Sequence, residues 1–236
     1  MLVRPLRCFV AILVLGAGAS ATRADPDAAG RADAYAAELS RIAERRAELA
    51  GRWAGAVGRA VPVERIAAEI TASVHELSRH WLGTRWGLGP PQASHPGQGG
   101  KINCGTFVGR VLRDAGFVVD VARLQRQPSQ LIIESFTSTS RRWSRAPMER
   151  FLADVRAMGP GLFIIGLDFH VGLLIQTDDD LRFVHASYET RTVVDEPARA
   201  ARPVIDSKYR VVGKLLGRAN VRDWLAGRRI AVRGGW

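Results

Sequence analysis

Three side chains of the sequence have the right types to carry nucleophilic chemistry together. They are Cys104 in NCGTFVGRVLRDAGF, His170 in LDFHVGLLI and His185 in RFVHAS. A thiol becomes an effective nucleophile when a neighbouring base takes its proton and a third group holds that base in place. One thiol and two imidazoles therefore predict acyl transfer, provided that the fold brings the three side chains together.

The thiol of Cys104 has no second thiol to pair with. The other cysteine, Cys8, lies in MLVRPLRCFVAILVLGAGASATRAD, where basic residues precede an apolar run and an A-x-A site. This order predicts a secretory signal peptide over residues 1–24, cleaved near Ala21 or Ala24, and a periplasmic or secreted protein. An unpaired cysteine of an exported protein is a reactive thiol, a partner for another chain or a small buried hydrophobic group.

The thiol segment is predicted to be a helix that begins at Cys104. Asn103 is suited to the N-cap and Gly116 to the C-terminal end. In the first turn of a helix, free N–H groups and the macrodipole favour negative charge, so the sequence predicts a lowered pKa for Cys104. The spacing i, i+3, i+4, i+7, i+8, i+11 of one apolar face supports the helix, which carries Cys104, Phe107, Val108, Val111, Leu112 and Ala115.

The two histidines are predicted to lie on adjacent strands of a hairpin. If Asp178 and Asp179 form a two-residue turn, His185 falls opposite Gly172. His170 and His185 then share one face as diagonal neighbours, with β-carbons about 7 Å apart or less. A three-residue loop or a bulge would move one of them to the other face.

The elements around these residues predict an α+β fold. A thiol helix packs on an antiparallel sheet, and an N-terminal helical region precedes it. The apolar stripes of that region are expected to pack within the chain, with a dimer or a wall-targeting element as the alternative. A segment rich in glycine and proline, 82–103, is predicted to be neither helix nor strand. Helices are predicted over 26–58, 63–81, 128–136, 147–158 and 221–225, and strands from 161 to about 196 and over 208–216.

Composition narrows the classes of function. The formal net charge is +11, with the basic residues scattered along the chain, so nucleic acid is not an expected partner. Nowhere do about 18 uninterrupted apolar residues occur, so no stable membrane span is expected. No cofactor is implied, and no metal site is expected, because the histidines of HELSRH are not four apart. The oligomeric state stays open.

In order along the chain, LGTRW (82–86), NCGTFVGRVLRDAGF (103–117), HVGLLI (170–175) and FVHAS (183–187) resemble the NlpC/P60 family of cell-wall cysteine peptidases. The similarity covers about residues 81–187. It implies a papain-like fold in which 25–80 is a helical N-terminal region and 81–236 is a catalytic domain with a C-terminal extension. It also implies that Cys104 is the nucleophile, His170 the general base and His185 the group that orients His170.

The resemblance further implies the residues around the oxyanion and the substrate: Trp86, Asn103, Gly105 and Thr106. Trp86 stands where the family usually has a tyrosine that helps to stabilise the oxyanion. The family favours Asp-Cys-Ser-Gly at the thiol, whereas this chain has Asn-Cys-Gly-Thr over 103–106. The family's usual bond specificity is therefore not implied.

The sequence predicts an exported cysteine peptidase or amidase, a hydrolase that cleaves amide bonds in peptidoglycan stem peptides through an acyl-enzyme. Two alternatives stay open. One is a basic protein that binds the cell envelope without turnover. The other is a thiol amidase or acyltransferase that acts on another envelope amide.

Overall fold

The computed structural model describes residues 28–55, 62–90 and 92–235. The predicted signal peptide, residues 1–24, lies outside them. Within the described residues, no helix has both the length and the apolar character that a membrane span requires.

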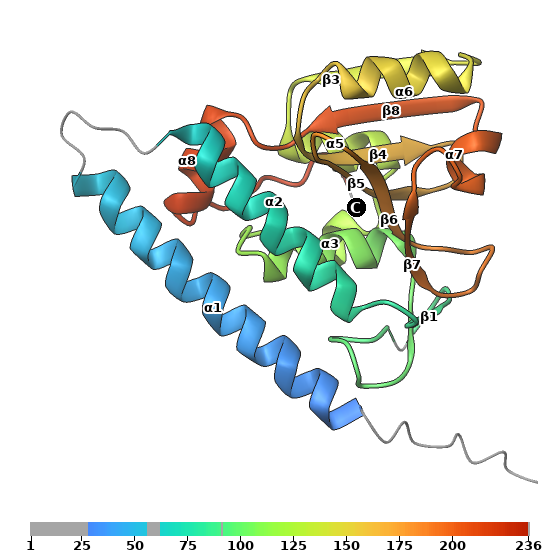
Figure 1. The fold of residues 1–236 in the computed structure, drawn as a ribbon. Coiled ribbons are helices and arrows are strands. Elements are labelled where there is room, and N and C mark those ends of the chain that lie inside the picture. Colours follow the sequence, from blue (N-terminus) through green and yellow to red (C-terminus); the bar gives the residue numbers. More distant parts are fainter. Residues whose placement is uncertain (1–27, 56–61, 91, 236) are drawn as a thin grey trace, which may run out of the picture.

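The centre of the molecule is one antiparallel sheet of six strands in the order β3-β8-β4-β5-β6-β7 (Figure 1). The predicted run of consecutive antiparallel strands after residue 161 is confirmed, because β4, β5, β6 and β7 are neighbours in that order. The strands are β3 (Ser140–Ser144), β4 (Gly161–Leu167), β5 (Val171–Gln176), β6 (Leu181–Ala186), β7 (Val193–Pro197) and β8 (Tyr209–Lys214).

Helices cover both faces of this sheet, and the fold class is α+β, as predicted. Figure 1 shows α6 above the sheet, with α2 and α3 on its other side and α1 farthest out. The helices are α1 (Ala28–Gly55), α2 (Val63–His80), α3 (Cys104–Asp114), α4 (Val121–Leu124), α5 (Ser129–Phe136), α6 (Met148–Arg156), α7 (Arg202–Asp206) and α8 (Arg218–Leu225).

Strand alternation divides the buried apolar side chains between two cores. Val171 and Leu173 of β5 belong to the larger core, which also contains the apolar faces of α2, α3 and α5. Leu174, the residue after Leu173, points to the opposite face and belongs to the smaller core with α6 and α7. Successive side chains of a strand point to opposite faces, so the strands β4, β5, β6 and β8 contribute to both layers.

The N-terminal helices are packed against the rest of the chain, as predicted for their apolar stripes. Tyr35, Ile42 and Leu49 of α1 are buried in the same core as α3. The Tyr35 hydroxyl donates to Asp114 Oδ2 over 2.6 Å, and Arg46 Nε donates to the Trp224 carbonyl of α8 over 2.7 Å. Burial and the Asp114 carboxylate raise the pKa of Tyr35, so this bond keeps its proton on the phenol.

Five short elements differ from the sequence prediction. The segment 82–103 does contain strand structure, because β1 (Arg85–Trp86) pairs in parallel with β2 (Lys101–Ile102). The helices α4 and α7 have only a few residues, too few for an apolar period to be read. The strand β3, which reads SRRWS, has one buried residue and pairs with distant β8.

Candidate active site

The thiol stands at the first residue of α3, as predicted. Asn103 caps the helix, because its Oδ1 accepts the Thr106 N–H over 2.9 Å. The Asn103 Nδ2 donates to Gln92 Oε1 over 3.2 Å, and the same oxygen accepts the Asn103 backbone N–H over 2.9 Å. The Asn103 side chain therefore positions the thiol helix and ties it to the glycine-rich segment.

The proton of the thiol is held more firmly than the helix terminus alone would predict. The backbone N–H groups of Val171, Gly105 and Cys104 itself favour the thiolate and lower the pKa of Cys104. Burial has the larger effect and raises the pKa of Cys104 above its ordinary value. The predicted lowering of this pKa is wrong, because the sequence shows the helix terminus but not the desolvation of the sulfur.

The predicted register of the histidine hairpin is confirmed. Strand β5 pairs with β6 from Gln176↔Leu181 to Leu173↔Val184, and the next pair in this register is Gly172 and His185. His170 Nε2 lies 2.7 Å from His185 Nδ1. A Cβ built on Gly172 would lie 2.9 Å from the His185 Cβ, so glycine is the residue that leaves space for the rings.

A third polar group extends the pair, because His185 Nε2 lies 3.0 Å from Glu196 Oε1. A carboxylate only accepts, so the proton of neutral His185 sits on Nε2 and its Nδ1 accepts from His170 Nε2–H. Neutral His170 then has its lone pair on Nδ1. That nitrogen has no hydrogen-bond partner among the described residues and is the base that the site offers.

Burial keeps both imidazoles neutral. His170 is 5% exposed, and burial, with the nearby His185, lowers the pKa of His170 to about 3. Burial also lowers the pKa of His185, against the opposing effect of Glu196. The resting site therefore holds a neutral thiol and neutral rings, not a thiolate–imidazolium pair.

The thiol and His170 are linked through the N-terminal end of β5: the backbone N–H of Val171 acts on the pKa of Cys104, and His170 directly precedes Val171. Helix α3 packs on the face of Val171 and Leu173, whereas strand alternation puts His170 and His185 on the other face, where Phe183 stacks on His185 at 4.0 Å. The β5–β6 ladder ends at Leu173↔Val184, and two residues before Leu173 lies Val171, whose backbone N–H lowers the pKa of the thiol. No thiol–imidazole hydrogen bond is present within the described chain. Such bonds are often long in unliganded enzymes.

Trp86, the residue predicted near the oxyanion, lies one strand away from the thiol segment. It is in β1 and pairs with Ile102, two residues before Cys104. Its indole Nε1 is buried and has no hydrogen-bond partner among the described residues. Buried donors are nearly always satisfied, so the unmatched Trp86 Nε1–H is a donor that can serve a bound group.

The two residues after the thiol have buried side-chain positions. Thr106 is 1% exposed, and its hydroxyl donates to Gln125 Oε1. A Cβ at Gly105 would lie 3.0 Å from the Gln125 carbonyl oxygen. Both positions face Gln125, and the Thr106 N–H is bonded to the Asn103 side chain, so the predicted contact of these two side chains with a substrate has no support in the structure.

Other side chains complete the surroundings of His170 and were not found from the sequence. The Tyr188 ring stands edge-on to the His170 ring at 5.5 Å and is 40% exposed. Phe169, next to His170 in the tight β4–β5 turn, is 95% exposed. No sequence pattern pointed to Glu196, because its position depends on the β6–β7 register. For Tyr188, the one available indication was that it follows His185 by three residues.

The described residues contain no group of three or more His, Cys, Asp or Glu side chains arranged to hold a metal ion. His75 of the HELSRH segment is bonded to Asp195 through Nε2 over 2.8 Å. This hydrogen bond ties α2 to β7.

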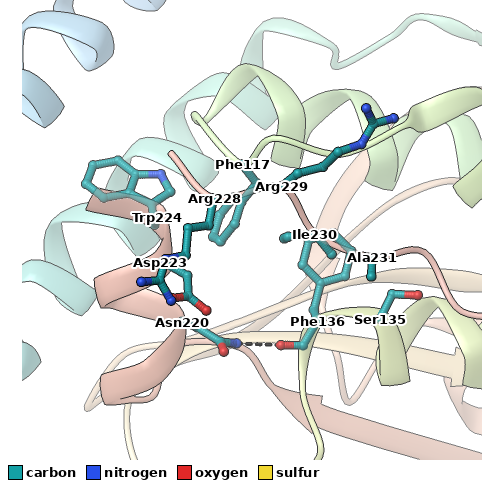
Figure 2. Close-up of a pocket in the computed structure, with 10 residues that line it drawn as sticks. All are labelled: Phe117, Ser135, Phe136, Asn220, Asp223, Trp224, Arg228, Arg229, Ile230 and Ala231. Atoms are coloured by element: carbon teal, nitrogen blue, oxygen red, sulfur yellow. Dashed lines mark hydrogen bonds and ion pairs between the residues drawn. The ribbon is translucent and has the colours of Figure 1, made fainter. Parts of the chain in front are cut away.

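A hollow of about 180 Å³ lies elsewhere, between α5, α8 and the C-terminal segment (Figure 2). Phe117 and Phe136 form part of its wall. Arg228 pairs with Asp223 over 3.2 Å, and Figure 2 shows Arg229 extending away from both. The charged side chains around the hollow are directed to one another or away from it. None of the three predicted catalytic residues lines the hollow.

No family model matches the chain, and no curated protein matches it. Crystal structures of an N-acetylmuramoyl-L-alanine amidase from Bacteroides uniformis ATCC 8492 are similar at 12% identity. One covers 62% of this chain and 99% of its own with a TM-score of 0.36, and another covers 60% and 98% with a TM-score of 0.35. A likeness of this size does not carry the amidase activity to this chain.

Proposed function

We propose that this protein is an exported cysteine hydrolase that cleaves amide bonds in peptidoglycan stem peptides. The proposal is supported by one observation: the backbone N–H of Val171 acts on the free thiol of Cys104 at the start of α3, and His170, the residue before Val171, begins the hydrogen-bonded chain to His185 and Glu196. A nucleophile, a base and groups that orient the base are the parts that thiol acyl transfer needs.

The neutral resting state defines the order of proton movements. His170 Nδ1 takes the thiol proton as the sulfur attacks the amide carbon, and the imidazolium formed is stabilised through His185 by Glu196. The tetrahedral intermediate collapses when His170 gives this proton to the leaving amine, which leaves a thioester on Cys104. Water then loses a proton to His170 and attacks the thioester. The acid departs and the proton returns to the sulfur.

Two donors are available for the oxyanion of the tetrahedral intermediates. The backbone N–H of Cys104 is at the free N-terminal end of α3. The buried Nε1–H of Trp86 has no acceptor in the described chain. Donors that are fixed before the reaction and unmatched in the resting enzyme stabilise charge that appears only in the transition state.

The substrate class rests on the sequence. The four motifs similar to NlpC/P60 peptidases and the predicted signal peptide point to an amide of the cell envelope. In this proposal the protein is a divergent, papain-like relative of that family and acts in the periplasm or outside the cell.

A second candidate function is binding to the envelope without turnover. The raised pKa of Cys104 and the lack of a thiol–imidazole hydrogen bond in the described chain favour it. A site of this kind would still hold a peptide in the region of Trp86 but would not form a thioester.

The Cys104→Ala variant separates the two. For a hydrolase, replacement of the nucleophile lowers the release of peptide fragments from muropeptides by at least about 10⁴-fold. Mass spectrometry of the digest measures the release and identifies the bond, and circular dichroism checks the fold. Equal release by both proteins, or none by either, contradicts the hydrolase.

A further inference from the structure

One loop connects the two sides of the thiol site. The segment 187–192 joins β6 to β7. Near its start, Tyr188 stands against the His170 ring at 5.5 Å. Near its end, the Arg191 guanidinium lies over the Trp86 ring, 4.5 Å from the ring centroid. The loop therefore places one side chain beside the base and another beside the unmatched indole donor.

The loop is held in this position by its own hydrogen bonds. The Ser187 N–H donates to the Thr192 carbonyl over 2.8 Å, and the Ser187 hydroxyl accepts the N–H groups of Glu189 and Thr190. The Trp86 N–H donates to the Arg191 carbonyl over 2.7 Å. Arg191 is thus fixed at both its backbone and its guanidinium.

The backbone of Arg191 has a φ of 63°, which is uncommon for a residue with a β-carbon. Such conformations cluster at functional sites, where the surrounding structure maintains them. Here the backbone bond from Trp86 and the stacking on its ring maintain it. The loop geometry alone would favour asparagine or glycine at this position, so the arginine side chain has a use of its own.

The guanidinium of Arg191 has no carboxylate partner among the described residues, and it is exposed. Arg85 and Lys101, which pair across β1 and β2, also have no ion pair there. Arg85 bridges to Thr192, the residue after Arg191. Three cations thus gather on neighbouring backbone segments around Trp86, and the acid of the loop, Glu189, acts instead on His185.

A guanidinium that stacks on an indole keeps its N–H edge free. That edge matches the two oxygens of a carboxylate, and stacking reduces the side-chain freedom lost on binding. The neighbouring Asn103 is uncharged and is occupied as a helix cap. The positive charge at this side of the thiol therefore selects an acidic group on the substrate.

We propose that Arg191 binds a carboxylate of the peptide substrate, so that the protein prefers an acidic peptide over the same peptide with its carboxyl groups amidated. This inference rests on the proposed hydrolase function and names the substrate class of that site. Arg85 and Lys101 add attraction at longer range, and Arg191 makes the direct contact.

The test compares a muropeptide that has free stem carboxylates with the same muropeptide amidated at those groups. The wild-type protein is expected to prefer the acidic form by about tenfold or more in kcat/KM. Arg191→Gln removes the preference and Arg191→Lys retains part of it, since lysine keeps the charge without the fork. Both replacements keep a β-carbon at the same backbone position, so their strain is equal. Arg150→Gln on α6, an arginine with 76% of its side chain exposed, is the matched control and leaves the preference unchanged.

Binding to the inactive Cys104→Ala protein, measured by calorimetry, is the second readout. The acidic form should bind about tenfold more tightly, and Arg191→Gln in this background should remove the difference. The inference is overturned if Arg191→Gln keeps the preference, if it weakens both peptides equally, or if no preference is found in binding. Absence of turnover by the wild-type protein would instead contradict the proposed function, and the binding ratio would still decide the role of Arg191.

Discussion

The histidine side of the site and the Trp86 side differ in how far their polar groups are already satisfied. His170, His185 and Glu196 form a chain of hydrogen bonds that is complete except for one ring nitrogen. On the other side, the Trp86 Nε1 is buried without an acceptor and the Arg191 guanidinium has no carboxylate in the described chain. The histidine side can transfer protons through groups that are already hydrogen-bonded to one another. On the Trp86 side, the donors are available to bind a ligand.

This difference predicts that variants of the two sides will have different effects on stability and on the reaction. A change on the histidine side affects the resting protein as well as the reaction, because bonds that already exist are lost. A change on the Trp86 side affects the reaction but leaves the resting protein as stable as before, because the lost interactions form only with substrate.

Among variants of the two sides, the largest effect is expected for His170→Gln, which removes the base. The value of kcat should fall by about 10²- to 10⁴-fold, the usual contribution of a general base. Stability should change with pH as well. Between about pH 6.5 and 3, the unfolded chain holds a proton that folded His170 does not, so the wild-type protein loses stability as the pH falls through this window.

In this window His170 changes the free energy of unfolding by up to about 1.4 kcal/mol per pH unit. The His170→Gln variant should lack this contribution. Urea denaturation at pH 7.5 and at pH 5 measures the difference. A part of the slope remains from His185, whose pKa is also lowered by burial. If the variant and the wild-type protein lose equal stability between the two pH values, His170 is not buried in its neutral form.

Trp86→Phe should reduce kcat/KM by about 10²-fold, the loss typical of one oxyanion donor, because phenylalanine keeps an aromatic ring without the N–H. Its free energy of unfolding should stay the same or rise, since the variant no longer buries an unsatisfied donor. Steady-state kinetics and thermal denaturation measure the two. If Trp86→Phe lowers the free energy of unfolding as well as kcat/KM, Trp86 acts by packing. The Trp86 side would then not differ from the histidine side.

The sequence predicted what local rules determine. The α3 helix follows from its apolar period and its asparagine cap, and the histidine pair follows from a two-residue turn that fixes the β5–β6 register. Strand β3 was missed because its partner, β8, is distant in the chain. The thiol pKa was wrong in direction because desolvation depends on the packing of the whole domain.

The β6–β7 connection was the part of the site that the sequence could not resolve. A six-residue loop does not fix the register of the strands that it joins as a two-residue turn does. The sequence therefore did not predict the positions of Glu196, the partner of His185, and Arg191, which stacks on Trp86. It did predict β7 as a strand. The Trp86 side of the site depends on this loop and on a two-residue parallel strand pair, both set by tertiary contacts.

The smallest effect is expected at the outer end of the histidine chain, for Glu196→Gln. Glutamine can still accept from His185 Nε2–H, so the proton stays on that nitrogen, but the negative charge that stabilises the imidazolium is lost. Glu196 has 29% of its side chain exposed, so solvent screens its charge, and kcat/KM should fall by only about tenfold.

The pH profile distinguishes this electrostatic role from simple packing. The Glu196 carboxylate raises the pKa of His185, so its removal should move the acid limb of kcat/KM to lower pH. Arg150→Gln, at an exposed position of α6, should leave the limb in place. If Glu196→Gln lowers activity while the acid limb stays at the same pH, Glu196 only packs against the His185 ring. Its charge then has no part in the reaction.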